Sequence, residues 1–463
     1  MYRFYLNKVE NDYNYAELCR VFMQDDEFET IAVNFDANSK LCLGENSFLI
    51  NASGNKEPDY IKLELYRLLE SLCGCSNEWG TLTGVKPLKL AYNIFEKESD
   101  INKVSEILSE RYAVHNSKIE IIMDIMHYQM RNVSSPNTHN FSVYIGIPFC
   151  PTICAYCSFA SAVAVESHIE QYLNNLIKEI KYMGSLIDSN SSNSNQIESI
   201  YIGGGTPTTL NPLQLDRLIE SCEKYLHADA GKIEFTVEAG RPDTITAEKL
   251  EILQNHGISR ISINPQSMKD DTLSTIGRKH TAEQIIKSFE LANENNIPTI
   301  NADLIAGLPG ESNEDFCDSL KKVIELGAQN ITIHTLSVKN GSELREKDPE
   351  YFRQNTDMVN DMLESSKEIL KSNGYVPYYI YRQKHQIGAN ENVGYCKPGM
   401  HSIYNIRIME EKQTIIGLGA GAIGKVYYPD EDRLERIANV SNYKVYNERF
   451  EEMLLRKNKY YGG

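Results

Sequence analysis

Between residues 141 and 336, short apolar runs alternate with longer stretches in which apolar residues recur at helical spacing. The apolar runs read FSVYIGI, SIYIGGG, IEFTVEA, RISINPQ, TINADLIAGLP and NITIHTLS. The helical spacing is found between them, at 168–187, 212–226, 247–256, 282–295 and 314–326. Strands and helices in regular alternation predict an α/β fold in which parallel strands are joined by right-handed crossovers. Six such units favour a partial, TIM-like (β/α)6 barrel over a complete eightfold barrel.

The two flanks of this region have less regular patterns. Residues 1–140 combine strand-like runs at 2–6, 30–35 and 47–50 with helical spacing at 60–72, 102–112 and 118–130. They end in the polar stretch RNVSSPNTHN, which is typical of a linker. We therefore predict an N-terminal α+β accessory domain at 1–140, the barrel at 141–345, and a mixed C-terminal segment at 346–463 that covers the substrate.

Composition and charge restrict the location and the partners of the chain. A net charge of −17 gives no basic face for nucleic acid, so we expect no nucleic-acid partner. The N-terminus is polar where a signal peptide needs an apolar core, and no run approaches the ~18 apolar residues of a membrane span. We expect a cytoplasmic protein without a membrane span. In that reducing compartment, clustered cysteines are metal ligands or catalytic thiols rather than disulfides.

Cys150, Cys154 and Cys157 form such a cluster in the stretch IPFCPTICAYCSF, directly after the first barrel strand. Three thiolates on one loop can bind three irons of a four-iron cluster and leave the fourth iron open. A structural zinc site, completed by the distant Cys396 or by a histidine, is the alternative, since thiolates bind both kinds of centre. The spacing by itself leaves both open.

Polar and glycine residues follow the next strands at the ends where parallel barrels carry their reactive groups. Three glycines at 203–205 end the second strand, and amides freed by glycine can approach a charged ligand closely. Glu238 and Gln266 end the third and fourth strands, and Asp303 lies on the fifth. A single such residue is commonly a helix cap or an ion-pair partner, but their recurrence at successive strand ends favours a ligand site.

The CxxxCxxC loop with Tyr156 before its last cysteine, followed by GGGTPT at 203–208, resembles the radical S-adenosylmethionine enzymes. This resemblance implies a [4Fe-4S] cluster on Cys150, Cys154 and Cys157, with S-adenosylmethionine chelated to the open iron. One electron, from a donor such as flavodoxin or ferredoxin, would cleave it to a 5′-deoxyadenosyl radical. The implied cofactor contacts are Tyr144, Tyr156, Gly204, Gly205, Thr206, Glu238, Gln266, Arg278 and Asp303.

Longer motifs narrow this resemblance. IPFC, GGGTPT, FTVEAGRP, RISINPQS and DLIAGLPGE are similar to the oxygen-independent coproporphyrinogen III oxidase group. WGTLTGVKPLKL and YYIYRQKHQIGANENVGYCKPG resemble its branch of HemZ-type coproporphyrinogen dehydrogenases, which has an extra N-terminal domain. The implied reaction belongs to haem biosynthesis: two propionates of coproporphyrinogen III are oxidatively decarboxylated to vinyls, giving protoporphyrinogen IX.

A substrate with four carboxylates needs basic partners. The candidates are Arg241, Lys86, Arg382, Lys384 and Lys397, and the last three lie in an aromatic-rich stretch suited to a flat tetrapyrrole. For each of them, a solvated surface charge is the alternative.

Two departures from the best-known oxidases keep other functions open. Phe159 stands where those oxidases have a further cysteine, and Gly146 where they have a histidine. Haem-binding chaperones and radical methyltransferases or haem-opening enzymes of the same group remain alternatives, as does a zinc-stabilised barrel without activity. The chaperones' C-terminal HNxxYW-like segment is missing, and Trp79 is the only tryptophan. A second S-adenosylmethionine, on Tyr156, Thr206, Gln266 and Arg278, is neither required nor excluded by the resemblance.

The stretch GLGAGAIGK at 417–425 has the glycine spacing of a phosphate-binding loop. Val426 replaces the Ser or Thr that would bind magnesium, and no helix is predicted after it. We interpret it as a glycine-rich turn.

Overall fold

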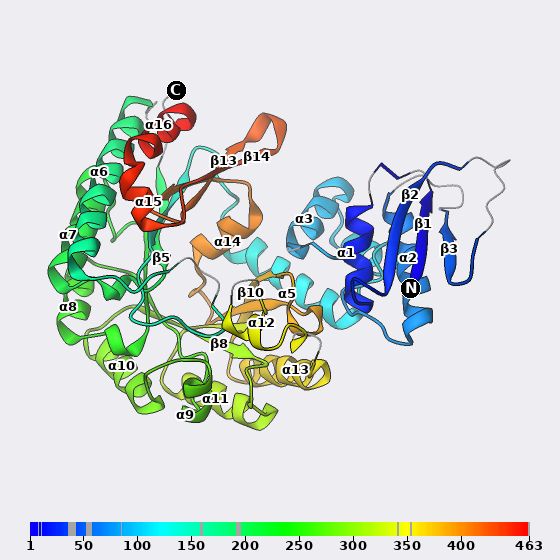
Figure 1. Ribbon diagram of the computed structural model, residues 1–463. Helices are drawn as coiled ribbons and strands as arrows, with labels where there is room; N and C mark the ends of the chain where they lie inside the picture. The colour runs from blue at the N-terminus through cyan, green and yellow to red at the C-terminus, as the bar shows by residue number, and fades with distance from the viewer. Residues whose placement is uncertain are drawn as a thin grey trace.

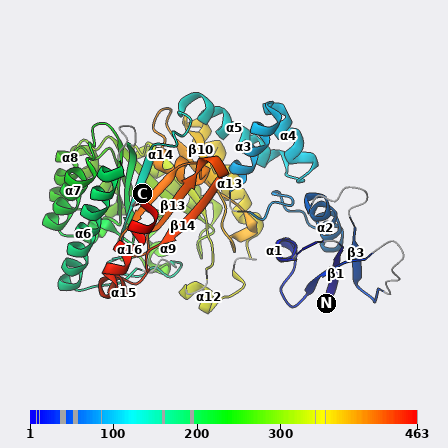
Figure 2. The ribbon, with the colours of Figure 1, turned by 90° about the horizontal axis from the view of Figure 1, so that it is seen from above.

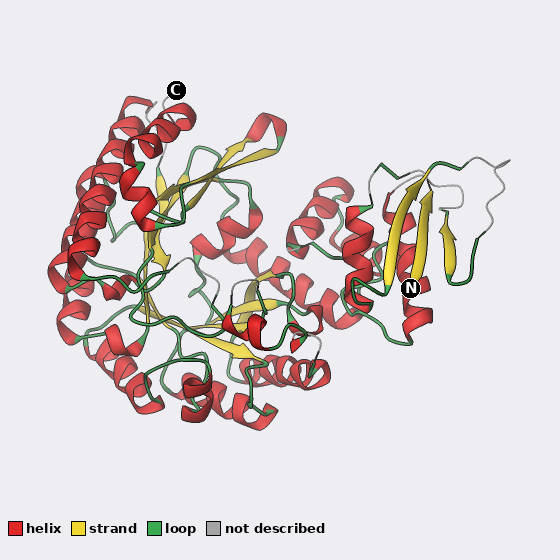
Figure 3. Ribbon diagram, in the orientation of Figure 1, coloured by secondary structure: helices red, strands yellow, loops and turns green. Residues whose placement is uncertain are grey.

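The computed structural model of the chain describes residues 1–7, 9–10, 12–35, 43–51, 58–84, 86–157, 161–190, 196–339, 342–351 and 354–461. These residues form one sheet of three strands near the N-terminus and one sheet of eleven strands that contains the barrel (Figures 1 and 3). None of the described helices is long and apolar enough to cross a membrane.

Six parallel strands form the wall of the barrel, in sequence order from β4 to β9. They are β4 (Phe141–Ile147), β5 (Ile197–Gly204), β6 (Glu234–Gly240), β7 (Arg260–Ile263), β8 (Thr299–Ala306) and β9 (Asn330–Thr335). Their apolar residues are buried on both faces, as expected for parallel strands covered by helices. The predicted α/β fold with a partial barrel is confirmed.

The connecting helices cover the outer face of this curved sheet (Figure 1). They are α6 (Glu166–Asn190), α7 (Pro212–Leu226), α8 (Ala247–Asn255), α9 (Asp270–Thr275), α10 (Ala282–Glu294) and α11 (Asn313–Glu325). Capping boxes at Asn211, Thr281 and Ser312 begin three of them, because each side chain accepts a hydrogen bond from the backbone of the first turn. Two 3-10 turns, η1 (Pro207–Thr209) and η2 (Pro242–Thr244), follow β5 and β6.

The C-terminal segment adds strands to both edges of the wall, which the sequence pattern did not predict. At one edge, β11 (Asn392–Cys396) pairs antiparallel with β9, and β10 (Val376–Tyr381) pairs with β11. At the other, β12 (Thr414–Leu418) pairs parallel with β4, and the antiparallel strands β13 (Ile423–Tyr428) and β14 (Arg433–Ala438) follow. The sheet order runs from β10 to β14 without pairing of these two strands, so the barrel is open.

In the described part of this segment, the helices are α13 (Thr356–Ser372), α14 (Ile403–Glu410), α15 (Tyr443–Glu448) and α16 (Phe450–Tyr461), and the short α12 (Glu343–Lys347) crosses its first residues. α13 packs against α11, and α15 and α16 pack against α6 at the side of the barrel (Figures 1 and 2). The glycine stretch at 417–425 spans the end of β12 and the start of β13, and it is a hairpin turn rather than a phosphate loop.

The N-terminal region contributes to two hydrophobic cores. β1 (Tyr2–Asn7), β2 (Phe28–Val33), β3 (Ser47–Ile50), α1 (Tyr13–Phe22) and α2 (Pro58–Cys73) surround one core of their own. Residues of α3 (Pro87–Glu98), α4 (Ile101–Glu110) and α5 (Asn116–Asn132) belong to the large core of the barrel, with α3 and α5 against β10 (Figure 2). The domain limits given above remain a prediction.

Candidate active site

A cavity of about 500 Å³ lies inside the barrel wall. The residues predicted to bind the cluster and the cofactor all line it: Tyr144, Cys150, Cys154, Tyr156, Cys157, Gly204, Gly205, Thr206, Glu238, Gln266, Arg278 and Asp303. They come together because parallel strands deliver their carboxyl ends to one edge of the sheet.

The cysteine loop leaves the end of β4 and is fixed by backbone hydrogen bonds. Cys150 N donates to Ala162 O over 3.1 Å, and Ala155 N donates to Ile276 O over 3.0 Å. The thiols of Cys150, Cys154 and Cys157 are partly exposed, and none forms a disulfide. Three thiols are therefore presented to one cavity.

The three thiols supply the donors that a four-iron cluster with one open iron needs, and Cys396 is not placed to add a fourth ligand for zinc. Among the described residues, no three His, Cys, Asp or Glu side chains are grouped closely enough to hold a metal ion, and the three thiols share the lining of the cavity. Cys396, the distant thiol considered for zinc, is buried in β11, where it donates to Tyr128 Oη over 3.6 Å. It does not line the cavity with the other three.

The glycine run at the end of β5 packs directly against this loop. Thr206 N donates to Phe149 O over 2.7 Å, and Gly205 N to Ile147 O over 2.8 Å. A β-carbon on Gly205 would lie 2.5 Å from Phe149 O, closer than atoms can approach. Gly204 has φ = 111°, a conformation that favours glycine. The glycines are needed because two backbones meet here.

Two carboxylates face the cavity in different electrostatic states. Glu238 accepts hydrogen bonds from Tyr201 Oη over 2.5 Å and from Gly204 N over 3.2 Å. Burial nevertheless raises the pKa of Glu238 to about 7. For Asp303, burial acts in the same direction, but hydrogen bonds from His334 and Asn301 outweigh it and lower the pKa. The site thus holds one carboxyl that titrates near neutrality and one that stays ionised.

Gln266 and Arg278 follow β7 and line the cavity. Gln266 has φ = 69°, and its backbone bridges to β8 through Asp303 O and Ile305 N. Arg278 is 8% exposed and donates to Tyr156 Oη over 3.1 Å and to Asn264 O over 3.0 Å. Its guanidinium therefore faces the cysteine loop.

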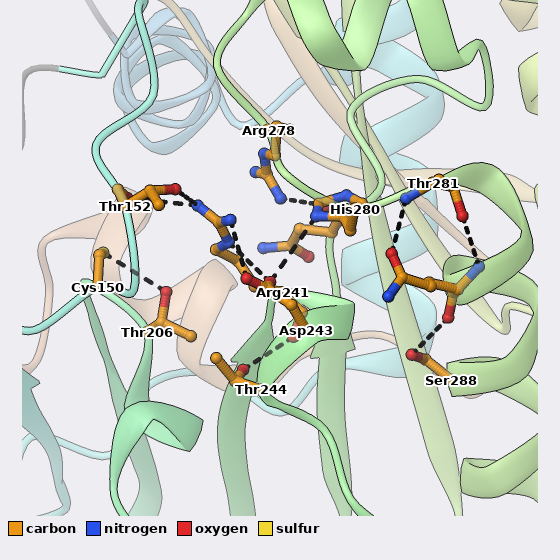
Figure 4. Close-up of polar contacts among 12 residues, drawn as sticks. Cys150, Thr152, Thr206, Arg241, Asp243, Thr244, Arg278, His280, Thr281 and Ser288 are labelled. Carbon is orange, nitrogen blue, oxygen red and sulfur yellow. Dashed lines mark hydrogen bonds and ion pairs between the residues drawn. The ribbon is translucent and has the colours of Figure 1, made fainter.

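Of the five basic residues considered as partners for substrate carboxylates, one lines the cavity and four lie elsewhere. Arg241 lines the cavity, but its guanidinium is directed at the cysteine loop and at Asp243 (Figure 4). The other four do not line it. Arg382 is buried against the Trp79 ring and bonded to backbone carbonyls, Lys384 pairs with Glu17, Lys397 lies over Tyr375, and Lys86 pairs with Glu411.

A wall of tyrosines completes the cavity, and the sequence indicated it only through the run YYIY in β10. Tyr379 and Tyr381 stack with ring centroids 6.2 Å apart, and Tyr381 Oη lies 3.2 Å from His334 Nδ1. A second stack consists of Tyr144 of β4, Tyr201 of β5 and Tyr404 of α14. Sequence reasoning missed several lining residues: Tyr201, Arg260, Asn301, Asn330, Lys339, Asn392 and Tyr404.

Several buried polar atoms around the cavity lack hydrogen-bond partners in the described part of the chain. They are Thr236 Oγ1, Arg260 Nε and Nη1, Asn264 Oδ1, Gln266 Oε1, Asn301 Oδ1 and Asn330 Oδ1. Buried polar groups in native proteins are nearly always satisfied. The cavity therefore favours a polar ligand.

The departure at Gly146 has a local packing reason. A β-carbon there would lie 2.7 Å from Ala420 O, on the turn between β12 and β13. A histidine at this position would require that turn to move. Phe159, the other departure, lies outside the described residues.

Comparisons with known proteins agree with this geometry. Residues 144–323 match the family model of the Radical SAM superfamily. Over 400 residues the chain is 41% identical to the oxygen-independent coproporphyrinogen-III oxidase-like protein HemZ of Bacillus subtilis (strain 168), covering 85% of this chain and 79% of that protein. It is 32% identical over 285 residues to the heme chaperone HemW of the same organism, covering 62% and 71%.

Among solved structures, coproporphyrinogen III oxidase HemN from Escherichia coli superposes with a TM-score of 0.55 at 22% identity, covering 71% of this chain and 73% of that one. At this identity the likeness shows a shared fold.

Proposed function

Because the chain belongs to the oxygen-independent coproporphyrinogen-III oxidase-like family of radical S-adenosylmethionine proteins, we propose that it decarboxylates two propionates of coproporphyrinogen III to vinyls. The product is protoporphyrinogen IX. A small carrier such as flavodoxin or ferredoxin supplies the electron that cleaves S-adenosylmethionine. After hydrogen abstraction and loss of carbon dioxide, an external one-electron acceptor takes the electron that is left on the substrate radical. The observation that carries the proposal is that one cavity combines three thiols, a glycine turn, cationic groups and a tyrosine wall.

The family uses a [4Fe-4S] cluster and S-adenosylmethionine, which together supply hydrogen-atom abstraction after one-electron reduction. In our proposal Cys150, Cys154 and Cys157 bind the cluster. The other predicted contacts bind S-adenosylmethionine: the glycine turn, which has no side chains in the way, lets its charged end approach the backbone closely, and Glu238 and Asp303 accept hydrogen bonds from its amino and ribose groups. Gln266 lines the same cavity, and its buried Oε1 has no hydrogen-bond partner among the described residues, which supports this assignment.

The tyrosine wall supports a flat, partly apolar substrate. Tyr379 and Tyr381 present stacked rings to the cavity, and aromatic faces pack well against a tetrapyrrole. Substrate propionates would meet Lys339 and the polar pair His334 and Tyr381 at the same wall. These groups would orient one propionate toward the cofactor while the surrounding strands exclude water.

Anaerobic turnover tests the proposal. Protein reconstituted with iron and sulfide is mixed with a reductant, S-adenosylmethionine and coproporphyrinogen III, and the tetrapyrroles are analysed by mass spectrometry. We expect 5′-deoxyadenosine together with a product lighter by two carbon dioxide units and their accompanying hydrogens. Absence of both products would overturn the proposal. A methylated or linearised tetrapyrrole would assign the chain to another reaction of the superfamily.

A second candidate, a haem-binding chaperone, is favoured by the 32% identity to HemW. Haem has the flat ring and the carboxylates that the same cavity would accommodate. Anaerobic titration with haem distinguishes the two candidates. A stoichiometric Soret band with unconsumed coproporphyrinogen III would favour the chaperone, and turnover without stable haem binding would favour the decarboxylase.

A further inference from the structure

Arg241 occupies an unusual position for a residue that lines the cavity. It follows β6 directly, after a register shift between Glu238 and Gly240, and Gly240 has φ = 50°. This irregular strand end turns the chain under the cysteine loop. The Arg241 side chain is consequently 4% exposed, and it extends beneath the loop rather than across the cavity (Figure 4).

The guanidinium holds the middle of the cysteine loop. Arg241 Nη1 donates to Thr152 Oγ1 over 2.6 Å and to Thr152 O over 3.3 Å. The same nitrogen lies 3.9 Å from Cys154 Sγ, as donor to the sulfur. Thr152 lies between the first two cysteines, so these hydrogen bonds fix the part of the loop that joins Cys150 to Cys154. They also place a permanent positive charge beside one cysteine sulfur.

Asp243 fixes the direction of this guanidinium. It accepts from Arg241 Nε over 3.0 Å and from Nη2 over 3.1 Å, which is the forked geometry of a strong arginine–carboxylate pair. His280 Nδ1 lies 3.8 Å from the same carboxylate. Burial, with Arg278 and Arg241 nearby, lowers the pKa of His280 to about 4, so the imidazole is neutral at neutral pH. Arg241 is thus the cation that Asp243 neutralises.

The backbone behind this pair is tied to the glycine turn. Thr244 Oγ1 donates to Arg241 O over 2.8 Å and shares a hydrogen bond of 2.6 Å with Thr208 Oγ1. Lys249 Nζ donates to Thr208 O over 2.6 Å and to Thr244 O over 3.0 Å. The end of β6 is therefore anchored to the motif that follows β5, which gives the guanidinium a rigid base.

We propose that Arg241 is a positioning residue that holds the cysteine loop and raises the reduction potential of the cluster bound there, and that Asp243 orients it and moderates its charge. The inference rests on the cluster assignment made above. Hydrogen bonds to the sulfurs and nearby charge are established determinants of iron–sulfur potentials. A positive charge favours the reduced, more negative cluster, and a carboxylate beside it opposes that effect.

Redox titration of the reconstituted protein, followed by the electron paramagnetic resonance signal of the reduced cluster, tests this inference. We expect Arg241→Gln to lower the equilibrium constant for one-electron reduction about tenfold, which corresponds to about 59 mV. Asp243→Asn should shift the potential in the opposite direction, because it removes the opposing charge and keeps the arginine. Arg241→Lys should restore part of the potential, and Arg217→Gln, on the outer helix α7, should leave it unchanged.

Opposite shifts from two residues that contact each other would not arise from a loosened loop, which would move both variants in the same direction. Unchanged potentials, or shifts of the same sign, would overturn the inference. If Arg241→Gln does not retain iron, Asp243→Asn and Arg241→Lys still decide the electrostatic effect. If the wild-type protein retains no iron and sulfide after reconstitution, the cluster assignment is overturned, and the inference with it.

Discussion

Lys457 on α16 and Glu179 on α6 form a charged pair whose side chains are completely shielded from solvent. Their charged atoms lie 3.6 Å apart, and Lys457 Nζ also donates to Gly417 O over 2.5 Å. Glu179 accepts from Gly419 N over 2.7 Å. This network therefore fastens the C-terminal helix to the turn between β12 and β13.

The same turn supports the strand that leads into the cysteine loop. Ala420 N donates to Tyr172 Oη over 2.9 Å, and Tyr172 donates to Gly146 O over 2.5 Å. The ring of Phe149, one residue before Cys150, packs edge-on against Tyr172 with centroids 5.2 Å apart. Loss of the buried pair should therefore loosen both α16 and the base of the loop.

Lys457→Met keeps the bulk of the side chain but leaves the Glu179 carboxylate buried without a cation. Removing one partner of a buried pair costs about 3–5 kcal/mol. We expect about 3 kcal/mol, the lower end of that range, because Glu179 keeps hydrogen bonds from Gly419, Tyr446 and Asn439. At about 1.4 kcal/mol for each factor of ten, this is a more than hundredfold loss of protection.

Hydrogen–deuterium exchange with mass spectrometry measures this loss locally, which suits a chain with several cores. Peptides from α16 and from residues 417–422 should exchange more than a hundred times faster, at about the ratio worked out above. Peptides from β1 and α2 should keep their rates, because they belong to a separate core. Lys459→Met, at an exposed position of the same helix, is the matched control. Wild-type exchange rates in α16 of Lys457→Met would refute the reasoning.

Three further substitutions test the site and its surroundings. Cys154→Ser should abolish the brown colour of the cluster and the cleavage of S-adenosylmethionine. Cys75→Ser, at an exposed thiol outside the cavity, should retain both. The iron content and the amount of 5′-deoxyadenosine formed measure the two effects. Glu311→Gln should stabilise the protein above pH 7. Burial raises the pKa of Glu311 from 4.5 to about 7, so the wild-type protein loses stability as the pH rises through that range. The thermal midpoints of the two proteins should converge below pH 4.5, and equal midpoints at every pH would contradict this. Lys384→Gln should leave tetrapyrrole affinity unchanged, since this lysine pairs with Glu17 outside the cavity, and fluorescence quenching by coproporphyrin would reveal any weakening.

Much of the barrel could be predicted because its signals are local. The apolar runs are β-strands with nearly the expected bounds, and the helix predicted at 212–226 is observed as Pro212–Leu226. The pairing of β12 with β4 had no such signal. It joins segments more than 250 residues apart through the register Thr414↔Phe141 to Leu418↔Ile145. The glycines of the C-terminal turn were visible in the sequence, but the strand that they approach was not.

In the candidate site, too, some residues could be placed from the sequence and others could not. Glu238 and Asp303 could be placed together from the sequence, because consecutive parallel strands end at one edge. In β10, Tyr379 and Tyr381 are two residues apart and therefore share one face of the strand, which lines the cavity. The basic residues at 382 and 384 follow the end of that strand and turn toward the N-terminal region, where Arg382 stacks on Trp79 and Lys384 pairs with Glu17.

Arg241 shows why the type of a residue and its position along the chain did not determine its role. In the sequence it follows a barrel strand in FTVEAGRPD, and a basic residue there is a reasonable partner for a substrate carboxylate. Its direction depends on the irregular end of β6 and on Asp243 two residues later, which together turn the guanidinium toward Thr152 and Cys154. A carboxylate that already engages two of its nitrogens leaves little of the fork for a propionate. The same charge is therefore better placed to act on the thiolate ligands than on the substrate.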